Sequence, residues 1–388
     1  MKPTVTLLLC AIGVAVTSSA IAQENSAPDQ QYFPGRWGEW ETREPAAVGM
    51  NAERLNEAVE FAKQAENPAS KNLSEVVALS FANEPFDTIV GPTKPRGGAN
   101  GLIVKNGYIV AEWGDTKRVD MTFSCTKSYL STVAGLAMDD GLVRSANDRL
   151  QDYVRDGKFD SEHNAKITWE HLLQQTSDWS GTLWDKPDWA DRPQGRNRTK
   201  WKDRELHEPG SFFKYNDVRV NLLASSLMDV YRKPLPVVLR ERIMDPIGAS
   251  PTWRWHGYKN SWVTLDGQTM QSVSGGGHWG GGMFICSRDH ARFGYLFLRN
   301  GKWRDKQLIS KDWIKALRVP AKANSEYGYM WWLNTNKSRI PSAPESAFNA
   351  SGFGGNYVYV DQENDLLIVL RWTPDLSGVV KKVLAAIE

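Results

Sequence analysis

The chain has 388 residues, of which 41% are hydrophobic and 24% charged, and its formal net charge at pH 7 is +2. That length can bury a large hydrophobic core, and the composition is typical of a globular protein. A net charge this small, with no basic stripe along the chain, gives no electrostatic basis for binding nucleic acid. The six histidines are scattered and show no metal-ligand spacing with the cysteines, so we expect neither a metal nor an organic cofactor.

The first 22 residues have the features of a secretory signal peptide. Lys2 precedes an apolar run from about Val5 to Val16, and Ala20-Ile21-Ala22 supplies a small-x-small cleavage site. The run is too short to span a bilayer well, and a buried N-terminal helix is the alternative interpretation. No later stretch is typical of a transmembrane helix. We therefore expect a periplasmic or secreted protein with no transmembrane segment after signal cleavage.

The cysteines do not indicate a disulfide framework. Cys10 lies within the signal peptide, and its removal leaves Cys125 and Cys286. Two distant cysteines in an exported protein could pair, but each lies in a core-like segment. We expect two buried free thiols.

Strand patterns occur near both ends of the mature chain, in residues 23–122 and 298–388. The strongest is a hairpin whose two-residue turn is Asn106-Gly107, because both residues tolerate the positive φ that such a turn requires. Residues 123–297 show mainly helical patterns and long loops. The sequence therefore predicts an α+β fold, in which one antiparallel sheet is built from N- and C-terminal strands and flanked by helices. An all-helical lobe completes the fold, and the cleft between the lobes is the expected site. The strand patterns lie at 101–104, 108–113, 329–333, 356–360 and 366–372, and the flanking helical patterns at 52–65, capped by Asn51, and about 379–387.

Ser124 and Lys127 lie at the start of a helical pattern over residues 122–138, which ends at Asp139-Asp140-Gly141. From Tyr129 onward this helix is apolar or small on every side, and a lysine is seldom buried without a partner or a purpose. The i, i+3 spacing places both side chains on one face, about one turn apart. Burial favours a neutral amine that can accept the serine proton, and the N–H of Ser124 is free to bind a developing oxyanion. A capping serine followed by a snorkelling lysine is the alternative interpretation.

Ser-x-x-Lys is a motif of penicillin-binding proteins and β-lactamases. Three later segments resemble class C β-lactamase-like serine hydrolases, in the family's order. Residues 167–177 resemble its helix-to-loop signature, residues 209–217 its Pro-Gly…Tyr-x-Asn segment, and residues 280–289 its Gly-Gly…Ser-x-x-Asp stretch. The resemblance runs from about residue 100 to 372 and implies a β-lactamase-like fold. The family includes β-lactamases, D-Ala-D-Ala peptidases, esterases, D-aminopeptidases and 6-aminohexanoate-dimer hydrolases.

By this resemblance, Tyr215 occupies the position of the family's tyrosine. A phenol beside Lys127 can relay the proton from Ser124 to the leaving group, and two nearby cations would hold it partly ionised. Asp217 stands where the family usually has an asparagine that donates a hydrogen bond to the substrate. A carboxylate cannot donate, so we expect Asp217 either to pair with Lys127 or to attract a cationic substrate. Asn216 could substitute for the amide if the local register differs.

The family's third motif, Lys-Thr-Gly or His-Thr-Gly, corresponds best to Ala350-Ser351-Gly352. The resemblance implies that Ser351 and Gly352 lie against the substrate, with Gly352 allowing its close approach to an edge strand. It also implies that the N–H of Phe353 is the second oxyanion donor, beside that of Ser124. The basic residue of the motif is missing, and because that residue helps to bind a substrate carboxylate, its loss weakens the case for β-lactam hydrolysis.

Several other features have both a functional and a structural interpretation. Trp184, with its neighbouring tryptophans, could line an acyl pocket or pin a long loop. His278 could touch substrate, although a structural role is the preferred interpretation. The glycines around it satisfy Gly-x-Gly-x-x-Gly but follow no apolar strand, so we reject a dinucleotide site. The basic stretch from Arg192 to Arg204 is interpreted as a solvated loop rather than an anion-attracting lid.

Together these features predict an exported serine hydrolase that cleaves an ester or small amide through an acyl-enzyme on Ser124. The expected partner is a small-molecule ester, amide or peptide substrate, and the sequence does not determine the oligomeric state. A β-lactamase or D-Ala-D-Ala carboxypeptidase is the first alternative. A penicillin-binding-type sensor or a noncatalytic cell-wall module is the second.

Overall fold

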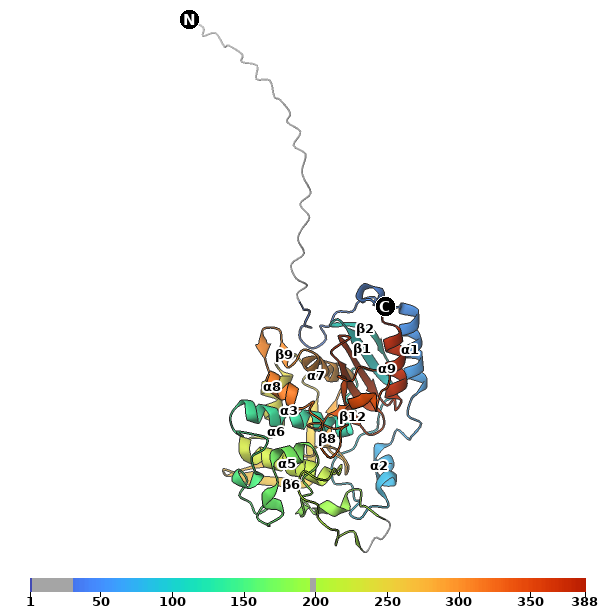
Figure 1. Cartoon of the computed structure of the whole chain (residues 1–388). Helices are drawn as coiled ribbons and strands as arrows, with labels where there is room; N and C mark the ends of the chain where they lie inside the picture. The colour runs from blue at the N-terminus through green and yellow to red at the C-terminus, as the bar shows by residue number, and fades with distance from the viewer. Residues whose placement is uncertain (2–30, 196–199) are drawn as a thin grey trace. The chain divides into compact units, whose positions relative to one another are not determined.

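A six-stranded antiparallel sheet is assembled from the two ends of the chain in this computed structural model, which describes Met1 and residues 31–195 and 200–388 (Figure 1). The strand order is β11–β12–β13–β14–β1–β2, and β1 pairs with β14 so that Gly101 lies opposite Leu370. This confirms that both termini contribute to one antiparallel sheet. The strands are β1 (Asn100–Lys105), β2 (Tyr108–Trp113), β11 (Trp332–Leu333), β12 (Phe348–Gly352), β13 (Asn356–Asp361) and β14 (Leu366–Arg371).

The β1–β2 hairpin has the turn that its sequence predicts. Asn106 has a φ of 52° and Gly107 a φ of 92°, so both central residues are left-handed. Two such residues are the requirement of the turn whose twist matches that of paired strands. The predicted Asn-Gly turn is therefore confirmed.

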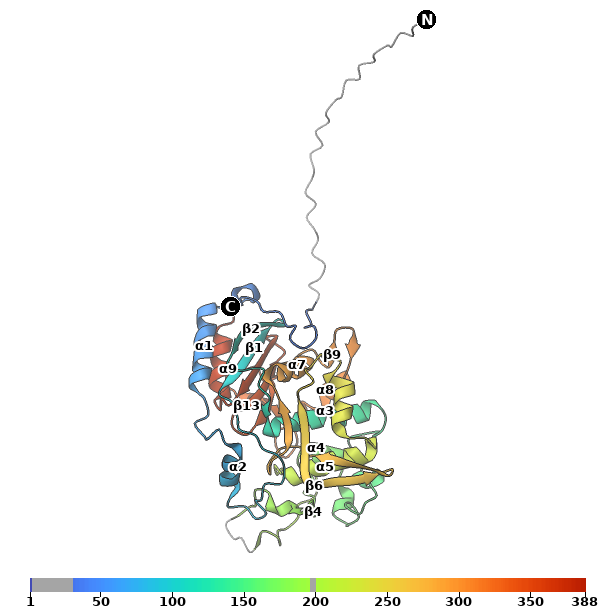
Figure 2. The same ribbon diagram turned by 180° about the vertical axis from the view of Figure 1, so that it is seen from behind.

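Helices cover both faces of the sheet. On β1, Leu102 and Val104 are buried in one hydrophobic cluster and Ile103 in another, as the alternation of side chains along a strand requires. Helices α1 (Ala52–Gln64) and α9 (Leu376–Ala385) lie side by side against one face (Figures 1 and 2). Helix α7 (Ser287–Leu298) packs on the opposite face.

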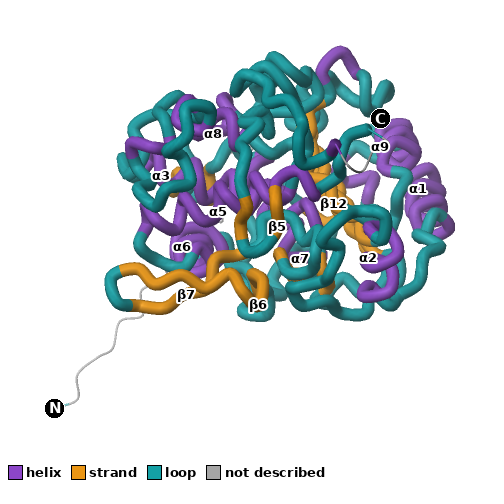
Figure 3. The backbone as a smooth tube through the Cα atoms, turned by 90° about the horizontal axis from the view of Figure 1, so that it is seen from below, coloured by secondary structure: helices purple, strands orange, loops and turns teal. Residues whose placement is uncertain are grey.

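The middle of the chain is more than a helical lobe, which corrects the expectation for residues 123–297. Strands β6, β7 and β8 lie within this range and form, with β3 just before it, a second antiparallel sheet of order β3–β8–β6–β7, whose β6–β7 ribbon stands out in Figure 3. The sequence hid the long strand β6 because its paired register shifts between Gly257 and Trp262, which breaks the regular alternation that marks a strand. The strands of this region are β3 (Asp120–Met121), β4 (Thr182–Leu183), β5 (Lys186–Pro187), β6 (Arg254–Leu265), β7 (Gln268–Val273) and β8 (Gly282–Ile285), and a further ribbon is formed by β9 (Lys302–Trp303) and β10 (Lys306–Gln307).

The helices of the middle region surround a buried central helix, α3 (Thr126–Asp139). Its residues from Thr126 to Ala137 are all buried, as the apolar pattern predicts. It follows a short 3₁₀ turn, η2 (Phe123–Cys125), and packs against α5 (Asp217–Tyr231). The remaining helices are α2 (Leu73–Phe81), α4 (Trp169–Leu173), α6 (Leu235–Leu239), the π-helical turn η7 (Arg240–Met244) and α8 (Lys311–Ala316).

Two further expectations can be compared with the structure. Cys125 and Cys286 are buried free thiols, as predicted. None of the described helices is both long and apolar enough to cross a membrane. The predicted signal peptide, residues 1–22, lies outside the described residues except for Met1. Residues 32–388 form one compact unit, and the boundaries placed at 122/123 and 297/298 stay predictions.

Candidate active site

Ser124 is presented on the tight turn η2, directly before α3. The preceding residue, Phe123, has a φ of 49°, a left-handed conformation that is unusual for an aromatic residue and costs energy unless the surroundings fix it. The hydroxyl of Thr126 fixes the turn, since it donates to the Phe123 carbonyl over 2.5 Å and accepts from the N–H of Met283 over 3.0 Å. Ser124 is partly exposed and lines a pocket, while its neighbours in sequence are buried.

Lys127 lies behind Ser124 and is paired with Asp217. Its Nζ lies 2.9 Å from Ser124 Oγ and forms an ion pair with the Asp217 carboxylate. Both charged side chains are only 1% exposed. Burial opposes ionisation of Asp217, but Lys127, Arg192 and His278 together lower the pKa of its carboxyl. The structure therefore shows the ion pair, one of the two alternatives for Asp217.

The ring of Tyr215 lies close to Lys127 and to Arg192. Its ring centroid is 4.6 Å from Lys127 Nζ and 5.3 Å from the Arg192 guanidinium, so the two expected cations are present. Burial and the charge of Asp217 nevertheless raise the pKa of Tyr215, against the smaller effects of its hydrogen bond with Ser124 and of Arg192. The expectation of a partly ionised phenol is wrong, because burial of the phenol, together with the Asp217 carboxylate, outweighs the effect of the cations.

A pocket of about 400 Å³ joins this centre to the end of β12. The predicted third-motif residues Ser351, Gly352 and Phe353 all line it, together with Ser124 and Tyr215. Strand β11 pairs only with the first two residues of β12, so the other end of β12 is free to face the pocket. The rest of the lining consists of Asn67, Arg192, Trp332, Gly354, Gly355, Tyr357 and Pro374.

Four of the predicted substrate-binding residues lie outside this lining. Asn216 is buried at the start of α5, where its Oδ1 caps the helix and its amide donates to the Asp188 carbonyl over 2.7 Å. His278 is buried, with Nε2 2.7 Å from Glu84 Oε2. Trp184 packs edge-on against Tyr258 in the β4–β5 turn. Asp217, the fourth, is held by Lys127.

Comparison with known proteins assigns the chain to a family. The Beta-lactamase family model matches residues 90–379, well over half of the chain. The chain belongs to the beta-lactamase family of serine hydrolases. The match includes every residue that lines the pocket except Asn67.

Relatives and solved structures of this family differ in their named activities. The beta-lactamase-family chain is 24% identical over 336 residues to a protein of Escherichia coli O157:H7 named "Putative D-alanyl-D-alanine carboxypeptidase", covering 70% of this chain and 77% of that one. A family VIII carboxylesterase has the same fold, with a TM-score of 0.58 at 16% identity over 87% of this chain and 99% of that one. A penicillin-binding protein homologue from Caulobacter crescentus has a TM-score of 0.56 at 15% identity, over 87% and 99% of the two chains.

Arg192 is the main residue of the pocket that the sequence analysis misplaced. It was interpreted as part of a solvated loop, whereas its side chain lines the pocket beside Ser124 and Tyr215. Its neighbour Asp191 is fully buried and accepts from the backbone N–H of Asp217. The only signal in the sequence was the acidic and apolar segment 188–191 directly before the basic stretch, which does not indicate where any side chain points.

Asp191 also belongs to a buried acidic cluster that no sequence spacing could have indicated. Its carboxylate, that of Glu84 and a His278 nitrogen lie within 4.8 Å of one another, although the three residues are far apart in the chain. His278 is already paired with Glu84, and Asp191 with Arg192 at 2.5 Å. These pairs account for the cluster without a metal ion.

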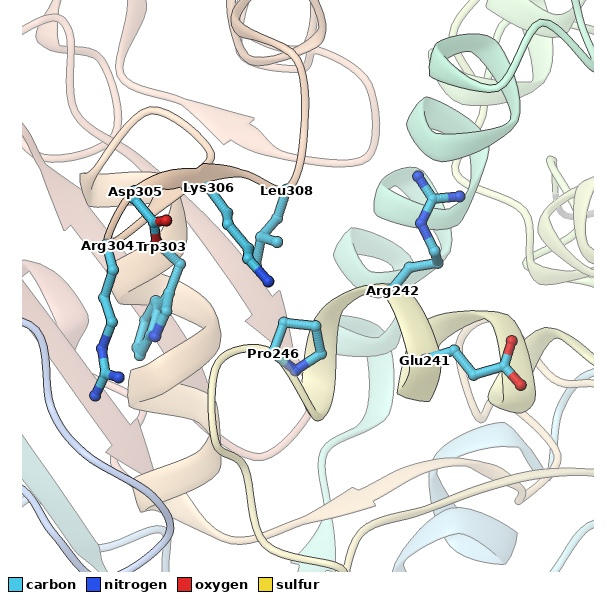
Figure 4. Close-up of a pocket in the computed structure, with 8 residues that line it drawn as sticks. All are labelled: Glu241, Arg242, Pro246, Trp303, Arg304, Asp305, Lys306 and Leu308. Atoms are coloured by element: carbon cyan, nitrogen blue, oxygen red, sulfur yellow. The ribbon is translucent and has the colours of Figure 1, made fainter.

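A second cavity of about 500 Å³ lies between the η7 segment and the β9–β10 ribbon (Figure 4). Among the described residues, those that line it include none of the predicted site residues. Its charged side chains are turned to different sides, and Arg242 is paired with Asp140. We assign it no role in the family chemistry. Its lining is Glu241, Arg242, Pro246, Trp303, Arg304, Asp305, Lys306 and Leu308.

The glycine at position 352 is required by the nucleophile turn, which gives a direct prediction. A Cβ at Gly352 would lie 2.2 Å from the Thr122 carbonyl oxygen, a backbone atom that cannot move without displacing Ser124. We expect Gly352→Ala to destabilise the fold by roughly 1–3 kcal/mol and to lower kcat/KM by about 10–100-fold. Thermal melting and ester hydrolysis measure the two effects. Gly98→Ala is the control, because its Cβ would meet nothing closer than 3.4 Å, and equal behaviour of the two variants would contradict the prediction.

Proposed function

We propose that the chain is an exported hydrolase that cleaves an ester or small amide through an acyl-enzyme on Ser124. The observation that carries the proposal is the position of Ser124 Oγ in the pocket, 2.9 Å from Lys127 Nζ and hydrogen-bonded to Tyr215. Nucleophile, base and relay are thus within reach of one another at an accessible site. The N-terminal signal-peptide pattern supports export, to the periplasm or the medium.

In the proposed reaction, Lys127 reacts in its deprotonated form, as the neutral amine: Ser124 Oγ attacks the substrate carbonyl and its proton passes to Lys127 Nζ. Because the pKa of Tyr215 is raised, the phenol remains protonated and passes a proton on to the leaving group, taking one back from Lys127. The N–H groups of Ser124 and Phe353, both of which line the pocket, would bind the oxyanion. Water then attacks the acyl-enzyme by the reverse path, releasing the acid and restoring Ser124.

A D-Ala-D-Ala carboxypeptidase or β-lactamase is the second candidate. It is supported by the name of the Escherichia coli relative and by the presence of Arg192 in the pocket. The esterase ranks first because Ala350 stands where the family's basic residue would be.

Parallel assays of 4-nitrophenyl butyrate and a chromogenic cephalosporin test the proposal. We expect the ester to be turned over faster than the cephalosporin. A faster cephalosporin rate would favour the second candidate. An acyl-enzyme that persists in intact-protein mass spectra would indicate a penicillin-binding-type sensor, and no adduct with any acylating probe would indicate a noncatalytic module.

A further inference from the structure

We propose that Arg192 binds a carboxylate of the substrate, so that the enzyme prefers esters or amides with a negative charge close to the reacting carbonyl. This inference rests on the proposed function, since it names the substrate class of the same pocket. It also gives the pocket a positive charge from a loop before α5 rather than from β12, the strand that carries Ala350.

The pocket lining has one permanent charge, and it is positive. Arg192 lines the pocket, whereas no aspartate or glutamate among the described residues does so. Lys127 is 1% exposed and lies behind Ser124, so it is not available to a substrate group. An anion that enters this pocket therefore meets a single cation and no like charge. A cationic substrate group would meet Arg192 instead, and the repulsion would disfavour its binding.

The nearby carboxylates are turned away from the pocket and neutralised by their own partners. Asp217 is paired with Lys127. Glu84 is paired with His278, whose Nε2 lies 2.7 Å from Glu84 Oε2. Asp191 is fully buried and accepts from Arg192 Nη1 at 2.5 Å. Their negative charge holds Arg192 in place without covering the face of the guanidinium that lines the pocket.

Arg192 is held by its neighbours, and most of its N–H groups have no hydrogen-bond partner among the described residues. Its Cζ lies 5.3 Å from the Tyr215 ring centroid and 5.9 Å from that of Phe81, and 35% of its side chain is exposed. Within the described ranges it hydrogen-bonds only to Asp191, through one of its five N–H groups. The planar fork that remains matches a carboxylate, which accepts two parallel hydrogen bonds.

The backbone at Arg192 supports a specific role. Its φ is 47°, in the left-handed region, where an arginine is strained. Such conformations persist where the surroundings over-determine them and are concentrated at ligand sites. At this strained position Arg192 lines the pocket, while its guanidinium is bonded to the buried carboxylate of the preceding residue, Asp191.

The test is the preference for a charged ester over its matched neutral ester. Two pairs locate the charge on either side of the scissile bond: 4-nitrophenyl hydrogen adipate against 4-nitrophenyl hexanoate, and 4-carboxyphenyl butyrate against 4-carbamoylphenyl butyrate. We expect the ratio of kcat/KM, charged over neutral, to fall about tenfold or more in Arg192→Gln for at least one pair, the scale of one charge-assisted hydrogen bond. Arg192→Lys, which keeps the charge but not the fork, should retain part of the preference.

Arg304→Gln is the matched control, because it removes the same charge from an exposed residue of the second cavity (Figure 4). Ratios that are equal in wild type and in both Arg192 variants for both pairs would overturn the inference. If no ester is hydrolysed, the proposed function fails instead. The inference is then decided by calorimetry, which compares the affinities of Ser124→Ala and of Ser124→Ala/Arg192→Gln for the adipate and hexanoate esters. Adding Arg192→Gln should shift the ratio of the two affinities about tenfold in favour of the neutral ester. An unchanged ratio would refute the inference.

Discussion

Replacing Ser124 by alanine should lower ester turnover by about 10,000-fold or more. The variant keeps the pocket, Lys127 and Tyr215, but it has no atom that can form the acyl-enzyme. The loss should appear in kcat, because the missing interaction is the covalent bond itself rather than substrate binding. Initial rates with 4-nitrophenyl butyrate measure it, together with intact-protein mass spectra that show whether an acyl adduct still forms.

Ser128→Ala is the control for this loss. Ser128 lies in the first turn of α3, directly after the turn that carries Ser124, but its hydroxyl is buried and donates to the Met330 carbonyl over 2.9 Å. We expect this variant to hydrolyse the ester within a few-fold of the wild-type rate. Hydrolysis by Ser124→Ala at the wild-type rate would show that another residue is the nucleophile. A loss of equal size in both variants would indicate damage to α3 rather than removal of the nucleophile.

The parts of the site that the sequence predicts are those set by local geometry. Ser124 and Lys127 are three residues apart where the turn η2 runs directly into α3, so their proximity follows from local helical spacing. The β1–β2 hairpin follows from Asn106-Gly107 in the same way. Tyr215 and Phe353 lie far from Ser124 in the chain, and only the family resemblance brought them to the site. Their presence in the same pocket is a matter of tertiary packing.

Charge networks are the part that the sequence could not predict. One such network comes from three separate segments of the chain and consists of Arg192, Asp191, Glu84 and His278. From the sequence alone, each of them could equally be a solvent-exposed surface residue. Of these four residues only Arg192 lines the pocket, from a left-handed backbone position that the sequence does not reveal. A run of basic residues in a sequence therefore does not indicate which of their side chains point to solvent and which line a pocket. Asp217 illustrates the same limit, since its sequence position left two roles open and only the buried pair with Lys127 distinguishes them.

That buried pair gives the second large effect, in stability as well as in activity. Lys127→Met should reduce kcat/KM by about 1,000-fold or more, because no base remains beside Ser124. It should also lower the free energy of unfolding at pH 7 by about 3–5 kcal/mol, because the Asp217 carboxylate is left buried without its cation. Arg192 and His278 remain nearby but are committed to Asp191 and Glu84. Urea unfolding and ester kinetics measure the two losses.

The stability difference should depend on pH in a defined direction. In the wild type the pKa of Asp217 is lowered on folding, so the pair stabilises the protein above the carboxyl pKa of the unfolded chain, about 4, and this is lost as the pH falls further. In Lys127→Met, Lys127 no longer offsets the effect of burial on the Asp217 carboxyl, so Asp217 should take up a proton at higher pH. Once it is protonated, the cost of burying an unpaired charge is removed. The difference between wild type and variant should therefore be largest at pH 7 and shrink towards pH 4. A difference that stays constant with pH would contradict the assignment.

The double variant Lys127→Met/Asp217→Asn separates the two roles of the pair. Removing the orphaned carboxylate should restore most of the lost stability, whereas activity should stay as low as in Lys127→Met. Asp217→Asn alone keeps Lys127 beside Ser124, so its activity should stay well above that of Lys127→Met. If the double variant is as unstable as Lys127→Met, the buried charge of Asp217 is not the cause, and the loss comes from the packing of the lysine side chain.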